Sequence, residues 1–360
     1  MTHRIALMFG GKSPEHEVSI RSARNIFAAI DKTKYDVVLI GVGRTGKWYH
    51  IDEEVFIDDP FEIDNALGEQ LAILPGLEHD QIIRLSDDKS LGKIEAVFPI
   101  IHGPNGEDGT LQGMLTQLNL PFVGPGVLGS SVAMDKDVCK RLFKEAGLFV
   151  ANGLVFHHFE KDAVDYQAVV NQLGSPLFIK PCNMGSSVGV SKATNEAEFQ
   201  AAIQLAFQFD TKVIVEEMLV GRELECAVLG NEFPEASGVG EVIVSKGFYD
   251  YETKYVTDDA QIMIPAENIS EFALEKIRMV ARQAFQVLGC EGMSRVDVFL
   301  TKDEDIYINE INTLPGFTSI SMYPKLWEKA GLPYDELIDN LLQLAIARTK
   351  RDNTLQRSRI

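Results

Sequence analysis

The chain has 360 residues, of which 45% are hydrophobic and 24% charged, a composition typical of a soluble globular protein with two or three domains. Its net charge of −19 argues against a protein that coats nucleic acid or an anionic membrane. The four cysteines lie far apart without a C-x-x-C pair, which argues against a zinc knuckle or a disulfide framework and fits a reducing cytoplasm. No apolar run approaches the length of a membrane span. We therefore expect neither nucleic acid nor a membrane as a partner.

The N-terminal part has the pattern of an open α/β sheet. An apolar strand at Arg4–Phe9 is followed by a glycine pair, a helical apolar spacing over Glu15–Ile30 and a second strand at Asp36–Gly41. This order predicts a parallel sheet with helices on its faces. A further strand at Ala96–Ile101 ends in a loop that begins with His102. In such sheets the loops at the carboxyl ends of the strands form the binding crevice, so we expect this loop and the glycine pair to lie there.

The middle of the chain carries a loop suited to phosphate. The Pro/Gly-rich segment Pro121–Gly126 marks a domain boundary, and a helix is predicted over Asp135–Ala146. A strand at Leu177–Pro181 leads into the glycine-serine loop Cys182–Ser187, and Val188–Ser191 is predicted as the return strand. Small residues expose backbone N–H groups and hydroxyls and allow close approach, which favours a hairpin loop over phosphates.

Two other glycine motifs match known patterns but lack their structural context. Gly41–Trp48 fits G-x-G-x-x-G and nearly fits the P-loop, yet a strand rather than a helix follows it, which favours a tight turn between strands. Gly185–Gly189 fits the hydrolase elbow G-x-S-x-G, which must run from a strand directly into a helix. A second strand intervenes here, so a serine nucleophile is disfavoured.

The stretch from Ser294 onward carries a group of oxygen ligands. The segments Ser294–Leu300 and Ile306–Asn312 read as strands, and the polar break between them predicts a hairpin. Because side chains alternate along a strand, Glu310 and Asn312 share one face. A register that sets Asp297 opposite Glu310 gathers two carboxylates and an amide oxygen, which suit Mg²⁺ together with phosphate oxygens. The alternative is a solvated strand face, which the depletion of Asp and Asn in strand interiors disfavours.

Two lysines complete a set of groups that suits Mg-ATP. Lys180 lies at the end of the strand before the glycine-serine loop, and Lys136 follows another Gly/Ser-rich loop. Either lysine alone is best interpreted as a solvated surface cation. Together with the glycine-serine loop and the acidic strand pair, they provide what is needed to hold the nucleotide and its metal.

With these motifs the chain resembles the D-alanine–D-alanine ligases of the ATP-grasp superfamily, from Arg4 to about Ala347. Seven matching pieces occur in family order, which is specific although each alone is weak. They are Gly10–Ser13 with Glu15–Ser19, His102–Gly103 with Gly106–Gly109, Met134–Lys136, Lys180–Pro181 with Gly185–Gly189, Tyr249–Tyr251 with Lys254–Tyr255, Arg295–Asp297, and Glu310–Gly316. Residues Cys182, Asn183 and Met184 fall in a variable part of the family motif and receive no role.

The resemblance implies an ATP-grasp fold, α/β overall and α+β in the ATP-binding part, with an N-terminal Rossmann-like parallel-sheet domain. The implied division is an N-terminal substrate domain 1–125, a central domain 126–215, a C-terminal domain 216–347 and a flexible basic tail 348–360. The implied reaction begins when ATP phosphorylates one D-alanine. The amine of a second D-alanine then attacks the acylphosphate, giving the dipeptide for peptidoglycan precursors, ADP and phosphate. Two Mg²⁺ ions, for which Mn²⁺ can substitute, and a cytoplasmic homodimer are also implied.

The resemblance also implies the roles of single residues. The residues expected to bind ATP are Lys136, Lys180, Ser187, Glu216, Glu217, Leu219, Glu223 and Lys254, with the three lysines at the phosphates. Asp297, Glu310 and Asn312 are expected to hold the metal. Arg295 and the N–H of Gly316 face the oxyanion. Glu15 takes the ammonium of the first substrate and is linked to Ser186 and Tyr255. Ser321 takes the carboxylate of the second substrate near His102, beside Met322.

The segment Lys246–Ile262 is rich in Tyr and charge and is predicted to be a lid, since an acylphosphate hydrolyses if water reaches it. Tyr255 also bears on the nearest competing function, that of a D-alanine–D-lactate ligase. Depsipeptide-forming enzymes with a shortened, altered lid lack this tyrosine. Three more distant functions are another carboxylate–amine ligase of the superfamily, a noncatalytic nucleotide sensor and a serine hydrolase. The motif at Glu15, the retained metal ligands and the strand after Ser187 argue against these three in turn.

Overall fold

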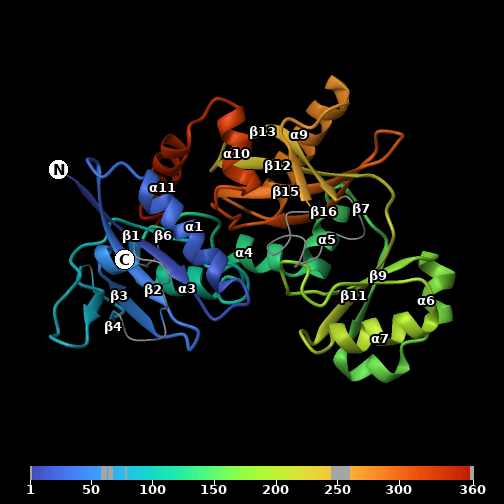
Figure 1. Ribbon diagram of the computed structural model, residues 1–360, viewed down its shortest axis with the longest axis horizontal. Helices are drawn as coiled ribbons and strands as arrows, with labels where there is room; N and C mark the ends of the chain where they lie inside the picture. Colours follow the sequence, from blue (N-terminus) through green and yellow to red (C-terminus); the bar gives the residue numbers. More distant parts are fainter. Residues whose placement is uncertain (1, 58–62, 64–67, 78, 245–259, 357–360) are drawn as a thin grey trace.

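The computed structural model describes residues 2–57, 63, 68–77, 79–244 and 260–356. Within these ranges the strands form a six-stranded N-terminal sheet, a four-stranded central sheet and a six-stranded C-terminal sheet. Figure 1 shows the N-terminal sheet on the left, the central sheet at the lower right and the C-terminal sheet above them. The chain therefore places its three sheets around a common middle region.

The predicted parallel order is confirmed in the N-terminal sheet. Strand β1 (His3–Gly10) pairs in parallel with both β2 (Tyr35–Val42) and β6 (Ala96–Pro99), and α1 (His16–Ala29) connects β1 to β2. Residues Ile5–Phe9 are fully buried, as expected for a central strand covered on both faces. Three antiparallel strands extend the sheet. The sequence predicted the first of them, which follows the turn at Gly41–Trp48, but not the other two. The remaining elements are β3 (Trp48–Ile51), β4 (Glu69–Ile73), β5 (Ile82–Arg84), α2 (Glu53–Ile57) and α3 (Thr110–Gln117).

The central sheet has the strand order β10-β9-β11-β8 and is antiparallel. Strand β9 (Leu177–Pro181) has the predicted bounds, whereas the return strand β10 (Ser191–Ala193) begins three residues later than predicted. The glycine-serine loop is therefore longer than the sequence suggested. The other elements are β8 (Gly153–His157), β11 (Lys212–Glu217), a 3-10 helix (His158–Ala163), α6 (Tyr166–Leu173) and α7 (Glu196–Ala206).

The C-terminal sheet has the order β14-β13-β12-β15-β16-β7. Strand β7 (Phe149–Val150) pairs in parallel with β16, so a segment from the predicted central domain completes the C-terminal sheet. No sequence pattern indicated this pairing, because β7 has only two residues. The strands are β12 (Arg222–Gly230), β13 (Glu235–Val244), β14 (Ala260–Met263), β15 (Gly292–Leu300) and β16 (Ile306–Asn312). The helices around them are α4 (Val127–Met134), α5 (Lys136–Glu145), α9 (Glu271–Val287), α10 (Met322–Lys329) and α11 (Tyr334–Asp352).

The predicted hairpin and its register are confirmed. Strands β15 and β16 pair antiparallel, with Asp297 opposite Glu310 and Arg295 opposite Asn312. The glycine motif at Gly41–Trp48 also has the predicted structure, because β2 and β3 are antiparallel neighbours joined there by a tight turn. Likewise β9 is followed by a loop and a second strand, which is not the strand-to-helix context of a hydrolase elbow.

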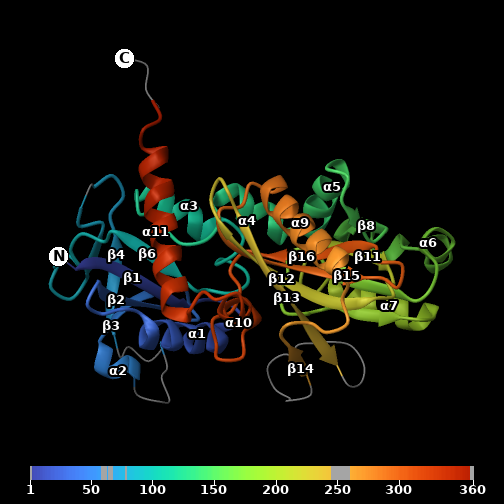
Figure 2. The same cartoon turned by 90° about the horizontal axis from the view of Figure 1, so that it is seen from above.

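The predicted start of a flexible tail at residue 348 is wrong. Helix α11 continues to Asp352, and Arg348 is buried, donating hydrogen bonds to the backbone oxygens of Gly124 (2.6 Å) and Phe122 (2.7 Å). In Figure 2 α11 lies beside the N-terminal sheet, with the C-terminal end of the helix pointing away from it. The basic composition suggested solvation, whereas this arginine satisfies backbone carbonyls at the boundary between the N-terminal part and α4.

The buried apolar residues of the described chain form four clusters. Two lie on the N-terminal sheet, and one of these also includes α10, α11 and residues of the C-terminal sheet. The third lies under α9 on the C-terminal sheet, and the fourth lies in the central sheet. Because the apolar residues pack in several clusters, polar residues can gather in the space between the three sheets. In the part of the chain that the structure describes, no helix is both long and apolar enough to cross a membrane.

Candidate active site

A cavity of about 760 Å³ lies between the loops of the N-terminal sheet, the glycine-serine loop and the C-terminal sheet. Its lining includes every described residue that was predicted to act on the amino-acid substrates. These residues are Glu15, His102, Ser186, Arg295, Gly316, Ser321 and Met322. Residues as far apart in the chain as Glu15 and Met322 thus face one space.

A smaller cavity of about 210 Å³ adjoins it, between the central sheet, α5 and the C-terminal sheet. Its lining includes every described residue that was predicted to bind ATP. These residues are Lys136, Lys180, Ser187, Glu216, Glu217, Leu219 and Glu223. Apolar side chains such as Phe178 and Ile308 lie on its walls beside these polar groups, a mixture that is common in small-molecule sites.

The two cavities meet at Lys136, Met184, Gly185 and Glu310, which line both. The Lys136 ammonium donates a hydrogen bond to the Met184 carbonyl oxygen (2.7 Å) and lies 3.4 Å from a carboxylate oxygen of Glu310. A cation and a carboxylate therefore stand at the point where a group in the small cavity can reach a group in the large one. This geometry suits transfer between two bound molecules.

Two lysines share the buried carboxylate of Glu216. The Lys180 ammonium lies 2.8 Å from one oxygen, and the Lys140 ammonium pairs with the other. Burial alone would raise the pKa of Glu216, but the two cations outweigh it and lower that pKa to about 2. Burial opposes the charge of Lys180 as well, yet Glu216 raises the pKa of this lysine. Lys180 is therefore held in its charged form on the wall of the small cavity, whereas burial outweighs Glu216 at Lys140 and lowers the pKa of that lysine.

Lys140 was not predicted as a site residue. It lies one helical turn after Lys136 in α5, and residues four apart share a helix face. That spacing was the available signal. The buried location beneath Glu216 depends on the packing of α5 against the central sheet, which the sequence did not indicate.

The Arg295 guanidinium is held between two carboxylates. Its Nε and a terminal nitrogen each donate to one oxygen of Asp297 at 2.7 Å, and its Nε lies 2.8 Å from Glu225. Burial opposes its charge, but both carboxylates raise the pKa of Arg295 above its ordinary range. Glu225 lies opposite Asp297 on β12 and was missed, although its alternation with Glu223 along the strand could have revealed it. Asp297 itself is buried and lines neither cavity.

The predicted metal ligands, two carboxylates and an amide, form a suitable donor set on the paired strands β15 and β16. Among the described residues, no group of three His, Cys, Asp or Glu side chains could hold a metal ion. Asp297 and Glu310 face each other across paired strands, and the amide oxygen of Asn312 accepts a hydrogen bond from the Leu314 N–H at 3.1 Å. Two carboxylates and an amide oxygen fit Mg²⁺ when phosphate oxygens complete its shell.

A hydrogen bond joins the N-terminal part to the glycine-serine loop. Glu15 occupies the N-cap position of α1, is buried, and its carboxylate accepts a hydrogen bond from the Ser186 hydroxyl. Ser186 and Ser187 have left-handed backbone angles, with φ of 50° and 58°. The loop thus turns sharply over the cavity, and the predicted link between Glu15 and Ser186 is confirmed.

A buried acid beside His102 had no predicted role. Glu107 accepts a hydrogen bond from the Gly103 N–H (2.6 Å), and burial together with the charge of Glu15 raises its pKa to about 8. His102 interacts with the Leu314 carbonyl oxygen at 3.0 Å, and burial lowers its pKa. Glu107 belongs to a motif that the sequence identified, but its burial depends on contacts distant in the chain.

The backbone of Gly316, after β16, lies close to the side chain of Ser321. A Cβ atom at Gly316 would lie 2.7 Å from the Ser321 hydroxyl oxygen. That oxygen accepts a hydrogen bond from the Thr318 N–H (2.9 Å), and Ser321 occupies the N-cap position of α10. The backbone of Gly316 and the Ser321 hydroxyl are therefore neighbours on the cavity wall. Lys254, Tyr255 and residues 246–259 of the predicted lid lie outside the described residues.

Sequence comparison identifies the family. Residues 4–125 match the family described as D-ala D-ala ligase N-terminus, and residues 142–343 match D-ala D-ala ligase C-terminus. This chain belongs to the D-alanine–D-alanine ligase family. A D-alanine–D-alanine ligase from Oceanobacillus iheyensis is 52% identical over 100% of this chain and 99% of its own length. D-alanine–D-alanine ligase A from Salmonella typhimurium is 52% identical over 98% of each chain.

Solved structures agree with this assignment. The D-alanine–D-alanine ligase from Coxiella burnetii has a TM-score of 0.87, with 37% identity over 98% of each chain. A D-Ala:D-Ser ligase from Enterococcus faecalis has a TM-score of 0.86, with 38% identity over 96% of this chain and 100% of its own. The predicted ATP-grasp fold and the prediction of a ligase that joins two D-alanines are confirmed. The D-lactate alternative is not favoured.

Proposed function

We propose that the chain joins two D-alanines through an acylphosphate at the junction of the two cavities. The small cavity holds ATP, and the large cavity holds both amino acids. The observation that carries this proposal is the shared lining at Lys136 and Glu310, because a γ-phosphate there lies next to the larger space. Phosphorylation converts a poor acyl donor into one with a good leaving group, and the reaction releases ADP and phosphate.

In this proposal the nucleotide is bound by lysines and by the adenine pocket. Lys136 and Lys180 neutralise phosphate oxygens, because phosphoryl transfer depends mainly on positioning and charge neutralisation. The N–H groups around Ser187 add hydrogen bonds. Lys254 is proposed as a third phosphate lysine. Residues of β11, β12 and their connection form the adenine and ribose pocket, namely Glu216, Glu217, Leu219 and Glu223.

Divalent metal is proposed to bind between the hairpin and the phosphates, with Asp297, Glu310 and Asn312 as protein ligands. When bound, two Mg²⁺ ions, or Mn²⁺ in their place, supply positive charge to the phosphate oxygens. The chain's own contribution is orientation: Arg295 fixes both oxygens of Asp297, and Lys136 stands beside Glu310.

The first D-alanine is proposed to bind with its ammonium at Glu15 and its carboxylate toward Lys136. The Ser186 hydrogen bond holds the Glu15 carboxylate in place, and Tyr255 is proposed to join this link. The second D-alanine places its carboxylate at Ser321, near His102 and Met322, and its amine attacks the acylphosphate. Both substrates then lie in the large cavity.

The tetrahedral intermediate carries an oxyanion, which Arg295 and the Gly316 N–H are proposed to stabilise. Preorganised donors of this kind typically contribute a factor of about 10²–10³ in rate. The segment 246–262 is proposed to close over the site, since exclusion of water protects the acylphosphate. The domain division at 125 and 215, a homodimer, a cytoplasmic location and a role in peptidoglycan precursor synthesis complete the proposal.

The test is phosphate release by the purified protein with Mg-ATP and millimolar D-alanine, followed by mass spectrometry of the product. We expect D-alanyl-D-alanine from D-alanine and no phosphate from L-alanine. D-Serine and D-lactate, offered as second substrates beside D-alanine at several pH values, test acceptor choice. Absence of phosphate release with D-alanine would overturn the proposal, and a mixed product with D-lactate in excess would reassign the acceptor.

A further inference from the structure

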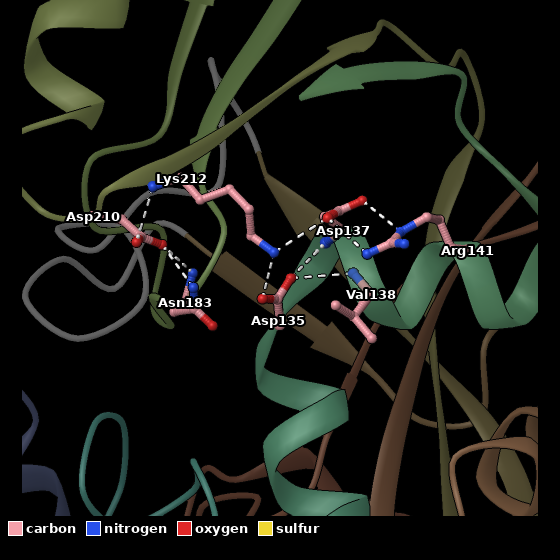
Figure 3. A network of polar contacts seen from close by, with 7 residues as sticks. All are labelled: Asp135, Asp137, Val138, Arg141, Asn183, Asp210 and Lys212. Carbon is pink, nitrogen blue, oxygen red and sulfur yellow. Dashed lines mark hydrogen bonds and ion pairs between the residues drawn. The ribbon is translucent and has the colours of Figure 1, made fainter. Parts of the chain in front are cut away.

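A polar network joins α5 to the start of the glycine-serine loop (Figure 3). The seven residues drawn there line neither cavity. At its centre the Lys212 ammonium lies 2.6 Å from a carboxylate oxygen of Asp135 and 3.1 Å from one of Asp137. Arg141 donates two hydrogen bonds to Asp137, at 3.0 and 3.1 Å. The side chains of Lys212, Asp135 and Asp137 are only 15, 18 and 14% exposed. An ion pair this sheltered is screened by solvent less than a surface pair.

The Asp135 carboxylate also caps the helix that begins with Lys136. It accepts hydrogen bonds from the N–H groups of Asp137 and Val138, both at 3.1 Å. Asp135 and Asp137, the two carboxylates that bind Lys212, therefore directly precede and directly follow Lys136 in the chain. Because this cap fixes the first turn of α5, it also fixes the backbone position from which the Lys136 side chain extends.

The backbone of Lys212 holds the other half of the network. Its carbonyl accepts a hydrogen bond from the Cys182 N–H (2.9 Å), and its own N–H donates to Asp210 (3.1 Å). The other oxygen of Asp210 accepts hydrogen bonds from the backbone and side-chain nitrogens of Asn183, at 2.7 and 3.0 Å. The first two residues of the glycine-serine loop are therefore tied to the start of β11.

A backbone hydrogen bond joins the start of α5 directly to the glycine-serine loop. The Lys136 N–H donates to the Cys182 carbonyl oxygen (3.0 Å), and the Lys136 ammonium reaches the next part of the loop at Met184. Lys212, Asp135 and Asp137 line neither cavity, so they lie outside the proposed nucleotide site. Burial opposes the charge on Lys212, but the two carboxylates outweigh it and raise its pKa, so the ion pair persists at neutral pH.

We propose that Lys212 is a positioning residue, whose side chain fixes Lys136 and whose backbone fixes the start of the glycine-serine loop, so that both meet the nucleotide phosphates in one geometry. This inference rests on the proposed role of Lys136 as a phosphate ligand. Without the Lys212 cation, Asp137 keeps its ion pair with Arg141, but the ion pair that joins Asp135 to β11 is lost. The positions of Lys136 and of the glycine-serine loop are then no longer fixed relative to each other.

The test replaces Lys212 with methionine, which keeps the apolar stem and removes the charge. Lys212→Arg is the rescue variant, because a guanidinium can bind two carboxylates. Lys192→Met is the matched control, since Lys192 is an exposed lysine on β10 of the same sheet. We expect kcat/KM for ATP to fall about 10- to 100-fold in Lys212→Met, as for a small misplacement of binding groups, with recovery in Lys212→Arg and no change in Lys192→Met.

A role in positioning the phosphate-binding groups is distinguished from a role in folding alone by measuring the affinity for ADP with Mg²⁺. Calorimetry measures this affinity at a temperature where circular dichroism shows that every variant is folded. We expect weaker ADP binding in Lys212→Met than in wild type. We also expect the double variant Lys212→Met/Lys136→Met to bind ADP as strongly as Lys136→Met alone. An affinity equal to wild type, or losses that add in the double variant, would overturn the inference. If Lys212→Met does not fold, Asp210→Asn tests the same network from the loop side, and unchanged ADP affinity in that variant would equally overturn it.

The ADP titration requires no turnover, so the two proposals fail separately. Wild-type protein that binds ADP but releases no phosphate with D-alanine refutes the proposed function. Normal ADP affinity in Lys212→Met, beside normal wild-type turnover, refutes only the positioning role.

Discussion

Asp297 on β15 lies directly opposite Glu310 on β16, so two carboxylates stand on adjacent strands of one antiparallel pair. Their surroundings differ. Asp297 is buried and bound through both oxygens by Arg295, whereas Glu310 lines both cavities beside Lys136. The pair therefore has one carboxylate fixed by its own strand and one presented at the junction, where phosphate and metal are proposed to meet.

Glu310→Gln should strongly reduce metal-dependent turnover while keeping the fold. The amide has nearly the same shape but no charge, so a divalent cation loses the carboxylate ligand that lines both cavities. We expect a fall in kcat of about 10² or more, in line with the loss of one preorganised electrostatic group. Phosphate release measured across a Mg²⁺ titration checks this. Asp303→Asn, in the exposed turn of the same hairpin, is the control, and retained turnover in Glu310→Gln would remove the metal assignment.

Lys140→Met should destabilise the protein. It leaves Glu216 with Lys180 as its cationic partner, in a place where both lysine side chains and the carboxylate are sheltered from water. Loss of one hydrogen bond to a buried charge costs about 1.5–3 kcal/mol in the free energy of unfolding. Urea unfolding at neutral pH measures it. Lys144→Met, on an exposed position one turn later in α5, should have wild-type stability, and equal stabilities of the two variants would contradict the buried pair.

The sequence predicted contacts between neighbouring segments better than contacts between distant ones. Strand alternation indicated that Asp297 and Glu310 could meet, but the register next to the turn, with Val298 opposite Ile308, would set Asp297 opposite Asn309. A β-bulge between Asp297 and Val298, which the sequence did not indicate, brings Asp297 opposite Glu310. The same reasoning located the strand before the glycine-serine loop. These successes share one property, which is that the decisive contacts lie close together in the chain.

Contacts between distant segments were not predictable in this way. The position of Lys140 beneath Glu216 joins α5 to β11 across 76 residues, and the burial of Arg348 joins α11 to Gly124 across 224. Neither residue type favours burial, so composition indicated solvent for both. Their locations follow from sheet packing, which periodicity alone does not determine.

Ser186→Ala should weaken binding of the first D-alanine. The variant loses the hydroxyl that donates to Glu15, so the carboxylate proposed to hold the substrate ammonium loses its partner across the cavity. We expect the KM for the first D-alanine to rise about tenfold, the effect of one hydrogen bond to a charged group. Steady-state kinetics at saturating ATP measure it. Ser191→Ala, at the start of β10 beyond the loop, is the control, and an unchanged KM in Ser186→Ala would mean that this hydroxyl is idle.

Glu107→Gln should change how stability depends on pH. Burial and the charge of Glu15 raise the pKa of Glu107 from 4.5 to about 8 in the folded protein, so between these values the folded state binds a proton that the unfolded state has released. The contribution of this carboxyl to the free energy of unfolding is therefore full below pH 4.5 and is lost as the pH rises toward about 8. Glutamine has no charge to titrate and still offers an oxygen to the Gly103 N–H. Urea unfolding at several values between about pH 5 and 8 should show wild-type stability declining relative to the variant as the pH rises. Glu336→Gln, at an exposed position in α11, should keep the wild-type dependence, and identical pH profiles for wild type and Glu107→Gln would contradict a raised pKa at this buried carboxyl.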